Sequence, residues 1–279
     1  MPICSRKRFT VPAAWQGTHV ELYVEGALSV SSWWLNGAPL LPLHTSGYTS
    51  VVLRLDNAGL AIGGDNTLVA FVDGTETTGW WYEGAGLTRH VTLTSSSAAA
   101  RVATHSLAAP AAPAGAIHAR ATPAEGLFSD SASVTPSLVL ENAGSAPVAA
   151  VVACALVEAA GAATTVSVTV PAGGEAPAAC PPLAPASAEL WSLPRPFLYT
   201  LAITVSVGGA VVDAMNASVG VRAVAWDSDH GLLVNGQRVK MRGYCNHESW
   251  GGVGAAVPDR VDLLRVQQVR GMGGNAWRT

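Results

Sequence analysis

Short alternating segments separated by turn residues constrain the fold of the first 95 residues more than any other feature. Between residues 19 and 25, the apolar Val20, Leu22 and Val24 alternate with polar or aromatic neighbours. This period of two is typical of a β-strand with one buried face. The dipeptide Asn36-Gly37 is a strong hairpin signal. Further strands are predicted at residues 51–55, 67–72 and 89–93.

Regularly spaced short strands of this kind predict an all-β sandwich over residues 1–98. About five or six strands can be recognised, whereas a jelly-roll sandwich usually has about eight. The sequence therefore predicts a jelly roll whose first strands are missing upstream of residue 1.

A second β-rich region is predicted over residues 99–223, a size that suits an immunoglobulin-like sandwich. The connectors between its strands are rich in Pro, Ala and Gly, and residues 171–185 are the clearest example. We expect these connectors to be loops. The strands are predicted at residues 116–122, 137–141, 148–156, 165–170, 198–207 and 211–219.

Residues 224–279 predict the first unit of a β/α barrel. A hairpin over residues 231–243 leads into a strand that ends in a polar cluster, Asn246, His247 and Glu248. A helix is predicted from residue 258 to about 272, and a second strand from 274 to 279. Barrel enzymes build their sites at the C-terminal ends of such strands. In the helix the apolar residues Val261, Leu264, Val269 and Met272 recur at helical spacing, with Arg260, Arg265, Gln268 and Arg270 on the surface.

Charge and hydropathy argue against nucleic acid and membrane as partners. Only 13% of the 279 residues are charged, and the net charge is −3, which gives no electrostatic attraction to a polyanion. The longest apolar run, residues 147–157, is too short for a spanning helix. The basic N-terminus lacks the hydrophobic stretch of a signal peptide.

The cysteines predict no metal site, and no ligand cluster predicts another cofactor. Cys4, Cys154, Cys180 and Cys245 are scattered without a CxxC spacing. Reduced and mostly buried thiols are the prediction here, ahead of a metal site or a disulfide framework.

Five stretches together resemble glycoside hydrolase family 2, the β-galactosidase, β-glucuronidase and β-mannosidase group. The resemblance covers nearly the whole chain, with the stretches in the family's order. It implies a carbohydrate substrate and a retaining β-glycosidase built from a jelly roll, an immunoglobulin-like sandwich and a TIM barrel. The stretches are residues 34–37 (WLNG), 81–91 (WYEGAGLTRHV), 189–199 (ELWSLPRPFLY), 220–222 (GVR) and 233–236 (LVNG).

Most of the aromatic residues in these stretches are expected to be structural. Trp80, Trp81 and Tyr82 could form a sugar-stacking platform, but a tight turn at a sheet edge is favoured because large aromatics mostly supply buried area. Trp191 and Tyr199 are expected in the core. Of the adjacent Trp33 and Trp34, only one can face the core of a strand pair.

The resemblance implies substrate-binding roles for His247 and Arg278. His247 matches a family histidine in GYCNHE (residues 243–248) that contacts the substrate, and the alternative is a solvated loop histidine. Arg278 matches the arginine of NAWR (residues 275–278), which in the family holds the nucleophilic glutamate; the alternative is a surface arginine. Glu248 is not expected to be the catalytic acid.

The catalytic carboxylate pair of a retaining glycosidase is not expected within this chain. The family places both glutamates on later barrel strands, and no Glu or Asp here matches either position. The sequence therefore predicts a truncated N-terminal part of a β-glycosidase that is inactive by itself. Residues 251–259 (GGVGAAVPD) resemble β-galactosidase-like members. The alternative is a non-catalytic carbohydrate-binding or interaction module.

Overall fold

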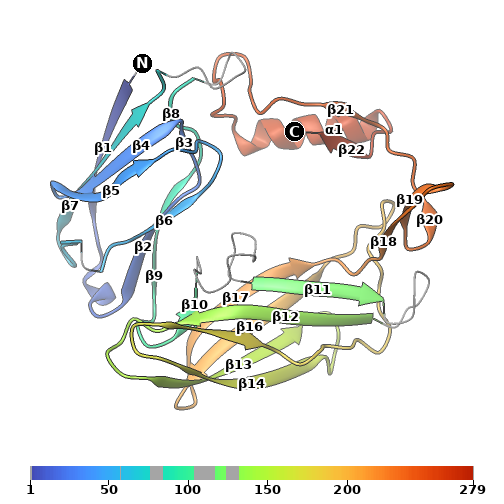
Figure 1. The fold of residues 1–279 in the computed structure, drawn as a ribbon, viewed down its shortest axis with the longest axis horizontal. Coiled ribbons are helices and arrows are strands. Elements are labelled where there is room, and N and C mark those ends of the chain that lie inside the picture. Colours follow the sequence, from blue (N-terminus) through green and yellow to red (C-terminus); the bar gives the residue numbers. More distant parts are fainter. Residues whose placement is uncertain (1, 57, 76–83, 104–116, 124–131, 279) are drawn as a thin grey trace. The chain divides into compact units, whose positions relative to one another are not determined.

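The computed structural model describes residues 2–56, 58–75, 84–103, 117–123 and 132–278. It is mainly β (Figure 1). The chain divides into two compact units. The first unit comprises Met1–Ser95 together with Met241–Thr279, and the second comprises Ser96–Lys240. Among the described residues, no helix has the length and apolar character needed to cross a membrane.

Two sheets form the larger part of the first unit. One has the order β1-β7-β4-β5 and the other the order β6-β2-β9, and a short pair joins β3 to β8. A single turn of 3₁₀ helix, η1 (Ala13–Trp15), follows β1. The strands are β1 (Pro2–Thr10), β2 (His19–Val24), β3 (Ala27–Leu28), β4 (Val30–Leu35), β5 (Ala38–His44), β6 (Val51–Arg54), β7 (Asp65–Asp73), β8 (Gly86–Leu87) and β9 (Val91–Ser96).

The core of these sheets comes from the alternating positions that the sequence predicted. Val20, Leu22 and Val24 of β2 are buried, as are the alternate apolar residues of β4 and β7. Trp33 is buried whereas Trp34 is only half-buried, which confirms that one of this pair faces the core. Burial of the apolar face of each sheet against the other is what stabilises this part of the chain.

The hairpin predicted at Asn36 and Gly37 joins β4 to β5. Both residues have a positive φ, 50° and 86°, as a two-residue type I′ turn requires. The Asn36 side chain adds hydrogen bonds of its own. Its Nδ2 donates to the Asn66 Oδ1, 2.8 Å away, and its Oδ1 accepts from the Thr67 backbone N–H. The turn is thereby tied to the start of β7.

Strand β1 was not predicted, because its sequence is basic and lacks a regular apolar alternation. It pairs antiparallel with β7 from Pro2 to Thr10, at the edge of its sheet. Charged side chains on an edge strand discourage pairing with another chain. Arg6, Lys7 and Arg8 are therefore compatible with a strand at this position.

The second unit also has two main sheets and a third, smaller one. In the first sheet β12 pairs with β10, β11 and β15, and the second has the order β14-β13-β16-β17. The smaller sheet has the order β18-β19-β20. The strands are β10 (Arg101–Val102), β11 (Ile117–Pro123), β12 (Ala132–Glu141), β13 (Val148–Leu156), β14 (Ala163–Val170), β15 (Glu175–Ala179), β16 (Tyr199–Val207), β17 (Ala210–Val219), β18 (Val224–Asp227), β19 (Gly231–Val234) and β20 (Gln237–Arg238).

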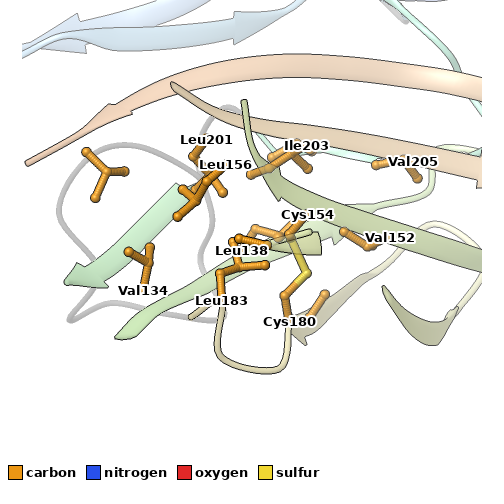
Figure 2. Close-up of a cluster of buried hydrophobic side chains, with 14 of the residues drawn as sticks. Val134, Leu138, Val152, Cys154, Leu156, Cys180, Leu183, Leu201, Ile203 and Val205 are labelled. Carbon is orange, nitrogen blue, oxygen red and sulfur yellow. A yellow bond between two sulfur atoms is a disulfide. The ribbon is translucent and has the colours of Figure 1, made fainter. Parts of the chain in front are cut away.

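Side chains from both main sheets meet in one buried cluster (Figure 2). Val134 and Leu138 come from β12, whereas Leu201 and Ile203 come from β16. All four are at most 3% exposed. The predicted strands at 148–156, 198–207 and 211–219 correspond to β13, β16 and β17 within one residue at each end.

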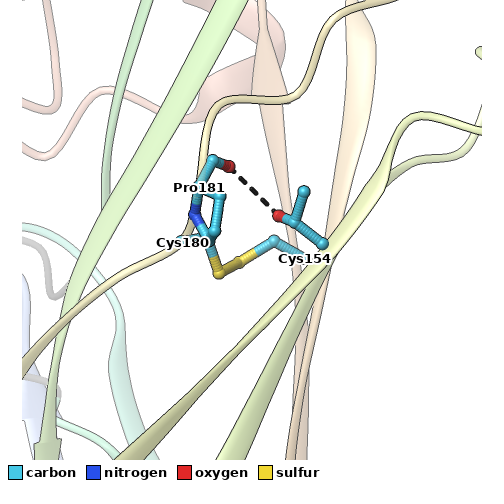
Figure 3. The surroundings of a disulfide bond; sticks show 4 residues. Cys154, Cys180 and Pro181 are labelled. Atoms are coloured by element: carbon cyan, nitrogen blue, oxygen red, sulfur yellow. Dashed lines mark hydrogen bonds between the residues drawn. A yellow bond between two sulfur atoms is a disulfide. The ribbon is translucent and has the colours of Figure 1, made fainter.

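Two predictions for the second unit were wrong. The expected loop at 171–185 contains β15. Glu175–Ala179 pairs with the second half of β12, and this pairing holds the segment in an extended conformation. Cys154 and Cys180 are not reduced thiols but form a disulfide (Figure 3). Cys4 and Cys245 are free, and both are exposed. The pairing depends on how β13 and β15 fold together, which the spacing of the cysteines does not reveal.

The C-terminal part of the first unit is the predicted strand–helix–strand. Strands β21 (Gly243–Cys245) and β22 (Ala276–Arg278) are parallel neighbours. Helix α1 (Asp259–Gly271) lies between them in the chain, with Asp259 and Asp262 in its first turn. The strands approach so closely at Gly243 that an added Cβ would lie 2.0 Å from the Ala276 carbonyl oxygen. Only glycine fits there.

The buried face of α1 is narrower than the sequence predicted. Val261, Arg265 and Val269, each four residues apart, are half-buried, whereas Leu264 and Met272 are exposed. Arg265 was expected on the surface, yet its side chain is only 12% exposed. Because residues at i, i+4 and i+8 share one helix face, a single row of side chains is covered.

Candidate functional site

The C-terminal ends of β21 and β22 lie side by side. Cys245 and Arg278 are partners in the parallel pair, and the Asn246 backbone N–H donates to the Arg278 carbonyl, 2.7 Å away. His247 and Glu248 therefore leave the sheet at the edge where Arg278 ends the neighbouring strand. We name residues 246–248 and Arg278 the strand-end edge. It is the edge where barrel enzymes place site residues.

Asn275 fixes the other end of this strand pair. Its Oδ1 accepts a hydrogen bond from the Arg242 N–H at 2.8 Å, and its own N–H donates to the Arg242 carbonyl at 2.8 Å. This side chain sets the register in which β22 meets β21. Asn275 is the first residue of the NAWR motif, and its role in the strand pair emerges only from the fold.

Arg265 of α1 holds the loop that follows β21. Its guanidinium donates to the carbonyl of His247 at 3.4 Å and to the carbonyl of Ser249. It also lies 4.7 Å from the centroid of the Trp250 ring, a cation–π geometry. Asp262, 3.3 Å away, supplies the countercharge. The loop bearing His247 is thus fixed through its backbone.

An ion pair joins this loop to the first two sheets of the same unit. The Arg89 Nη2 donates to the Glu248 Oε2 at 2.7 Å, and each side chain is a little under half exposed. Arg89 belongs to the stretch at 81–91 and Glu248 to the stretch at 243–248. Two motifs therefore meet through residues that are 159 positions apart in the sequence.

A pocket of about 350 Å³ lies beside this ion pair. Its polar groups include the Glu25 carboxylate, which lies 3.1 Å from the His90 Nδ1. Carboxylates accept and guanidinium donates hydrogen bonds, so the pocket suits a ligand rich in hydroxyl groups. It is lined by Glu25, Thr88, Arg89, His90, Glu248, Ala255, Ala256, Val257, Pro258, Asp259 and Asp262.

The two predicted site residues lie on the strand-end edge and not in this pocket. His247 and Arg278 are both exposed. Within the described part of the chain, the Arg278 guanidinium forms no ion pair. Glu248 forms an ion pair with Arg89. The possible aromatic platform at Trp80, Trp81 and Tyr82 falls outside the described residues.

The motif residues of the second unit form a structural cluster. The Trp191 N–H donates to the Val221 carbonyl at 2.8 Å, and the Asn235 side chain donates to the Trp191 carbonyl at 2.9 Å. The Arg222 guanidinium lies 4.9 Å from the centroid of the Trp191 ring. Tyr199 is buried as predicted, and Trp191 is half-buried. Three motifs thus stabilise one corner of the fold.

Comparisons with known proteins agree with these motifs. Residues 120–222 match the sequence model of glycosyl hydrolases family 2. A putative beta-glucuronidase from Formosa agariphila is 36% identical over 90 residues, which are 32% of this chain and 9% of that protein. Beta-galactosidase BoGH2A from Bacteroides ovatus is 34% identical over 90 residues, 32% of this chain and 11% of that protein.

The fold is also that of a solved family member. A glycosyl hydrolase family 2 protein from Bacteroides cellulosilyticus superposes with a TM-score of 0.86 at 22% identity, over 99% of this chain and 36% of that one. The chain thus spans about a third of that structure, and the two sequence alignments span about a tenth of their relatives. The match over residues 120–222 agrees with the resemblance to glycosyl hydrolases family 2 that the motifs predicted.

Proposed function

We propose that the chain is the N-terminal part of a retaining β-glycosidase that hydrolyses terminal β-linked sugars, with a β-galactoside as the favoured substrate. Its modules are a jelly roll at residues 1–98, an immunoglobulin-like sandwich at 99–223 and the start of a TIM barrel at 224–279. The observation that supports the proposal is the strand-end edge, where β21 runs parallel to β22, Arg278 ends β22 and His247 follows β21 in the chain.

His247 is the proposed contact to the sugar hydroxyls. A neutral imidazole donates one hydrogen bond and accepts another, which suits a hydroxyl that does both. Its backbone carbonyl is already held by Arg265, so the ring is presented from a fixed loop. Rigid support of this kind reduces the ordering cost of binding.

Arg278 is the proposed partner of a carboxylate. A guanidinium presents two parallel N–H groups that match the two oxygens of a carboxylate, and it favours the ionised form that a nucleophile needs. In a retaining enzyme this carboxylate and a second one lie about 5–5.5 Å apart. We propose that neither catalytic glutamate lies within these 279 residues.

Saturation-transfer NMR with methyl β-D-galactopyranoside tests the binding role. The wild-type chain is expected to saturate the sugar protons, and His247→Ala is expected to lose most of this signal. His230→Ala is the matched control, because His230 is also an exposed histidine but lies in the second unit beside Asp227. An unchanged signal in His247→Ala would contradict the proposed contact and would favour the non-catalytic binding module.

Turnover tests the catalytic half of the proposal. The purified chain is expected to release no chromophore from nitrophenyl β-galactoside or β-glucuronide above the buffer rate. Saturable turnover by these 279 residues, unaffected by further purification, would show that a carboxylate pair is present after all.

A further inference from the structure

A disulfide joins the two main sheets of the second unit. Cys154 lies on β13 in one sheet, and Cys180 follows β15 in the other. The Cys180 N–H donates to the Pro136 carbonyl at 3.0 Å, which continues the pairing of β15 with β12. The two Cα atoms are 6.4 Å apart, within the range of protein disulfides.

Both sulfur-bearing residues are inside the core. Cys154 is 0% and Cys180 2% exposed, and Leu138, Val152 and Leu183 lie around them (Figure 2). Next to the bond, the Thr164 hydroxyl donates to the Pro181 carbonyl at 3.1 Å and ties β14 to the same segment (Figure 3). A soluble oxidant or reductant cannot reach sulfur atoms that are packed in this way.

The other two cysteines are placed differently. Cys4 and Cys245 are exposed and unpaired, and both belong to the first unit. The second unit therefore contains two cysteines, and both are in the bond. This arrangement gives a single possible pairing within that unit. It also separates an internal cross-link from thiols that remain open to reagents.

We infer that Cys154–Cys180 is a structural cross-link formed while the second unit folds in an oxidising compartment, and not a reversible redox switch. Disulfides persist in such compartments and are rare where glutathione keeps thiols reduced. Because the folded core excludes reagents, the bond must form before the sheets close. Afterwards the same burial protects it from reduction. This inference does not depend on the proposed glycosidase function.

The bond forms by two exchange steps. One cysteine thiolate attacks the disulfide of a thiol–disulfide oxidant, which releases one oxidant thiolate and leaves a mixed disulfide. The second cysteine, deprotonated, attacks the protein sulfur of that mixed disulfide and releases the other oxidant thiolate. The protein loses two electrons and two protons as its two thiols become one disulfide, and the oxidant is reduced to a dithiol or to two thiols.

Counting the free thiols tests the inference directly. The full chain is refolded in a glutathione redox buffer or in excess dithiothreitol, the small thiols are removed, and the protein is denatured and alkylated without further reduction. Mass spectrometry is expected to find two alkylated cysteines, Cys4 and Cys245, after the glutathione refolding. It should find four after the dithiothreitol refolding. Four in both samples, or a peptide linking Cys154 to any cysteine other than Cys180, would overturn the cross-link.

Thermal unfolding and the site of expression complete the test. Cys154→Ala/Cys180→Ala is expected to lower the Tm of the second unit by roughly 5–15 °C, whereas Cys4→Ser/Cys245→Ser should leave it unchanged. Chain directed to the bacterial periplasm should carry the bond, and chain made in a reducing cytosol should carry four thiols. Complete bond formation in the reducing cytosol, or free thiols in the periplasm, would overturn the link to an oxidising compartment.

Discussion

Arg89 and Glu248 form a 2.7 Å ion pair that joins the sheets of the first unit to the loop following β21. Both side chains are partly exposed, and pairs of this kind contribute little to stability because water and salt screen them. The main effect of the contact is on the position of the loop. Arg89, which belongs to another motif, holds the side chain of Glu248, the neighbour of His247.

A double-mutant cycle on Arg89→Ala and Glu248→Ala should give a coupling free energy of about 0.2–1 kcal/mol. Amide resonances of residues 246–248 should nevertheless shift clearly in each single variant. Arg195→Ala, which removes a partly exposed ion pair with Glu189 in the second unit, should leave those resonances in place. Unshifted loop amides in Arg89→Ala would contradict the positional role.

Replacing Gly243 with alanine should disrupt the parallel strand pair. The new Cβ would lie 2.0 Å from a backbone oxygen of β22, and strands must separate to accept it, at a cost of about 1–3 kcal/mol. Hydrogen exchange of the β22 amides should accelerate accordingly. Gly251→Ala is the matched control, because a Cβ there meets no atom within 4 Å. Equal protection of β22 in both variants would contradict the close approach.

Arg265→Met should loosen the loop that bears His247. The substitution keeps much of the side-chain volume but removes the donors to the His247 and Ser249 carbonyls, a loss of about 1–3 kcal/mol. Arg260→Met in the same helix replaces an exposed arginine and should have little effect. The readout is hydrogen exchange across residues 246–250, where only Arg265→Met is expected to reduce protection.

The second unit should show a pH dependence at Glu158. The Thr200 backbone N–H and then its hydroxyl donate to this carboxylate and hold its pKa below the ordinary value of 4.5. The ionised form is thus favoured in the folded state. The contribution of the ionised Glu158 carboxylate to the stability of the fold is fully present above pH 4.5. This contribution disappears as the pH falls through the lowered pKa. A carboxyl NMR titration that placed the pKa of Glu158 at or above 4.5 would contradict the two hydrogen bonds.

Local pattern predicted most strands and the strand–helix–strand, because alternation and turn residues act over a few positions. Val20, Leu22 and Val24 identified β2, and Asn36 identified the hairpin after β4. The residues Glu175–Ala179 gave no such signal, since β15 is held in its extended conformation by pairing with β12.

Long-range contacts were the part that the sequence could not predict. Cys154 and Cys180 give no spacing signal for a disulfide, and Arg89 and Glu248 are 159 residues apart. Arg265 was expected on the surface from its charge, but the loop carbonyls make its burial favourable. The family motifs pointed to His247 and Arg278, whereas the contacts that hold the strand-end edge emerged only from the fold.

Amide chemical-shift mapping of the whole chain during titration with methyl β-D-galactopyranoside tests the strand-end edge as the sugar-binding site. The shifts are expected to centre on residues 246–248 and on Arg278, at the paired ends of β21 and β22. Shifts confined to the second unit, or an absence of shifts at the strand-end edge while sugar binds elsewhere, would contradict this site.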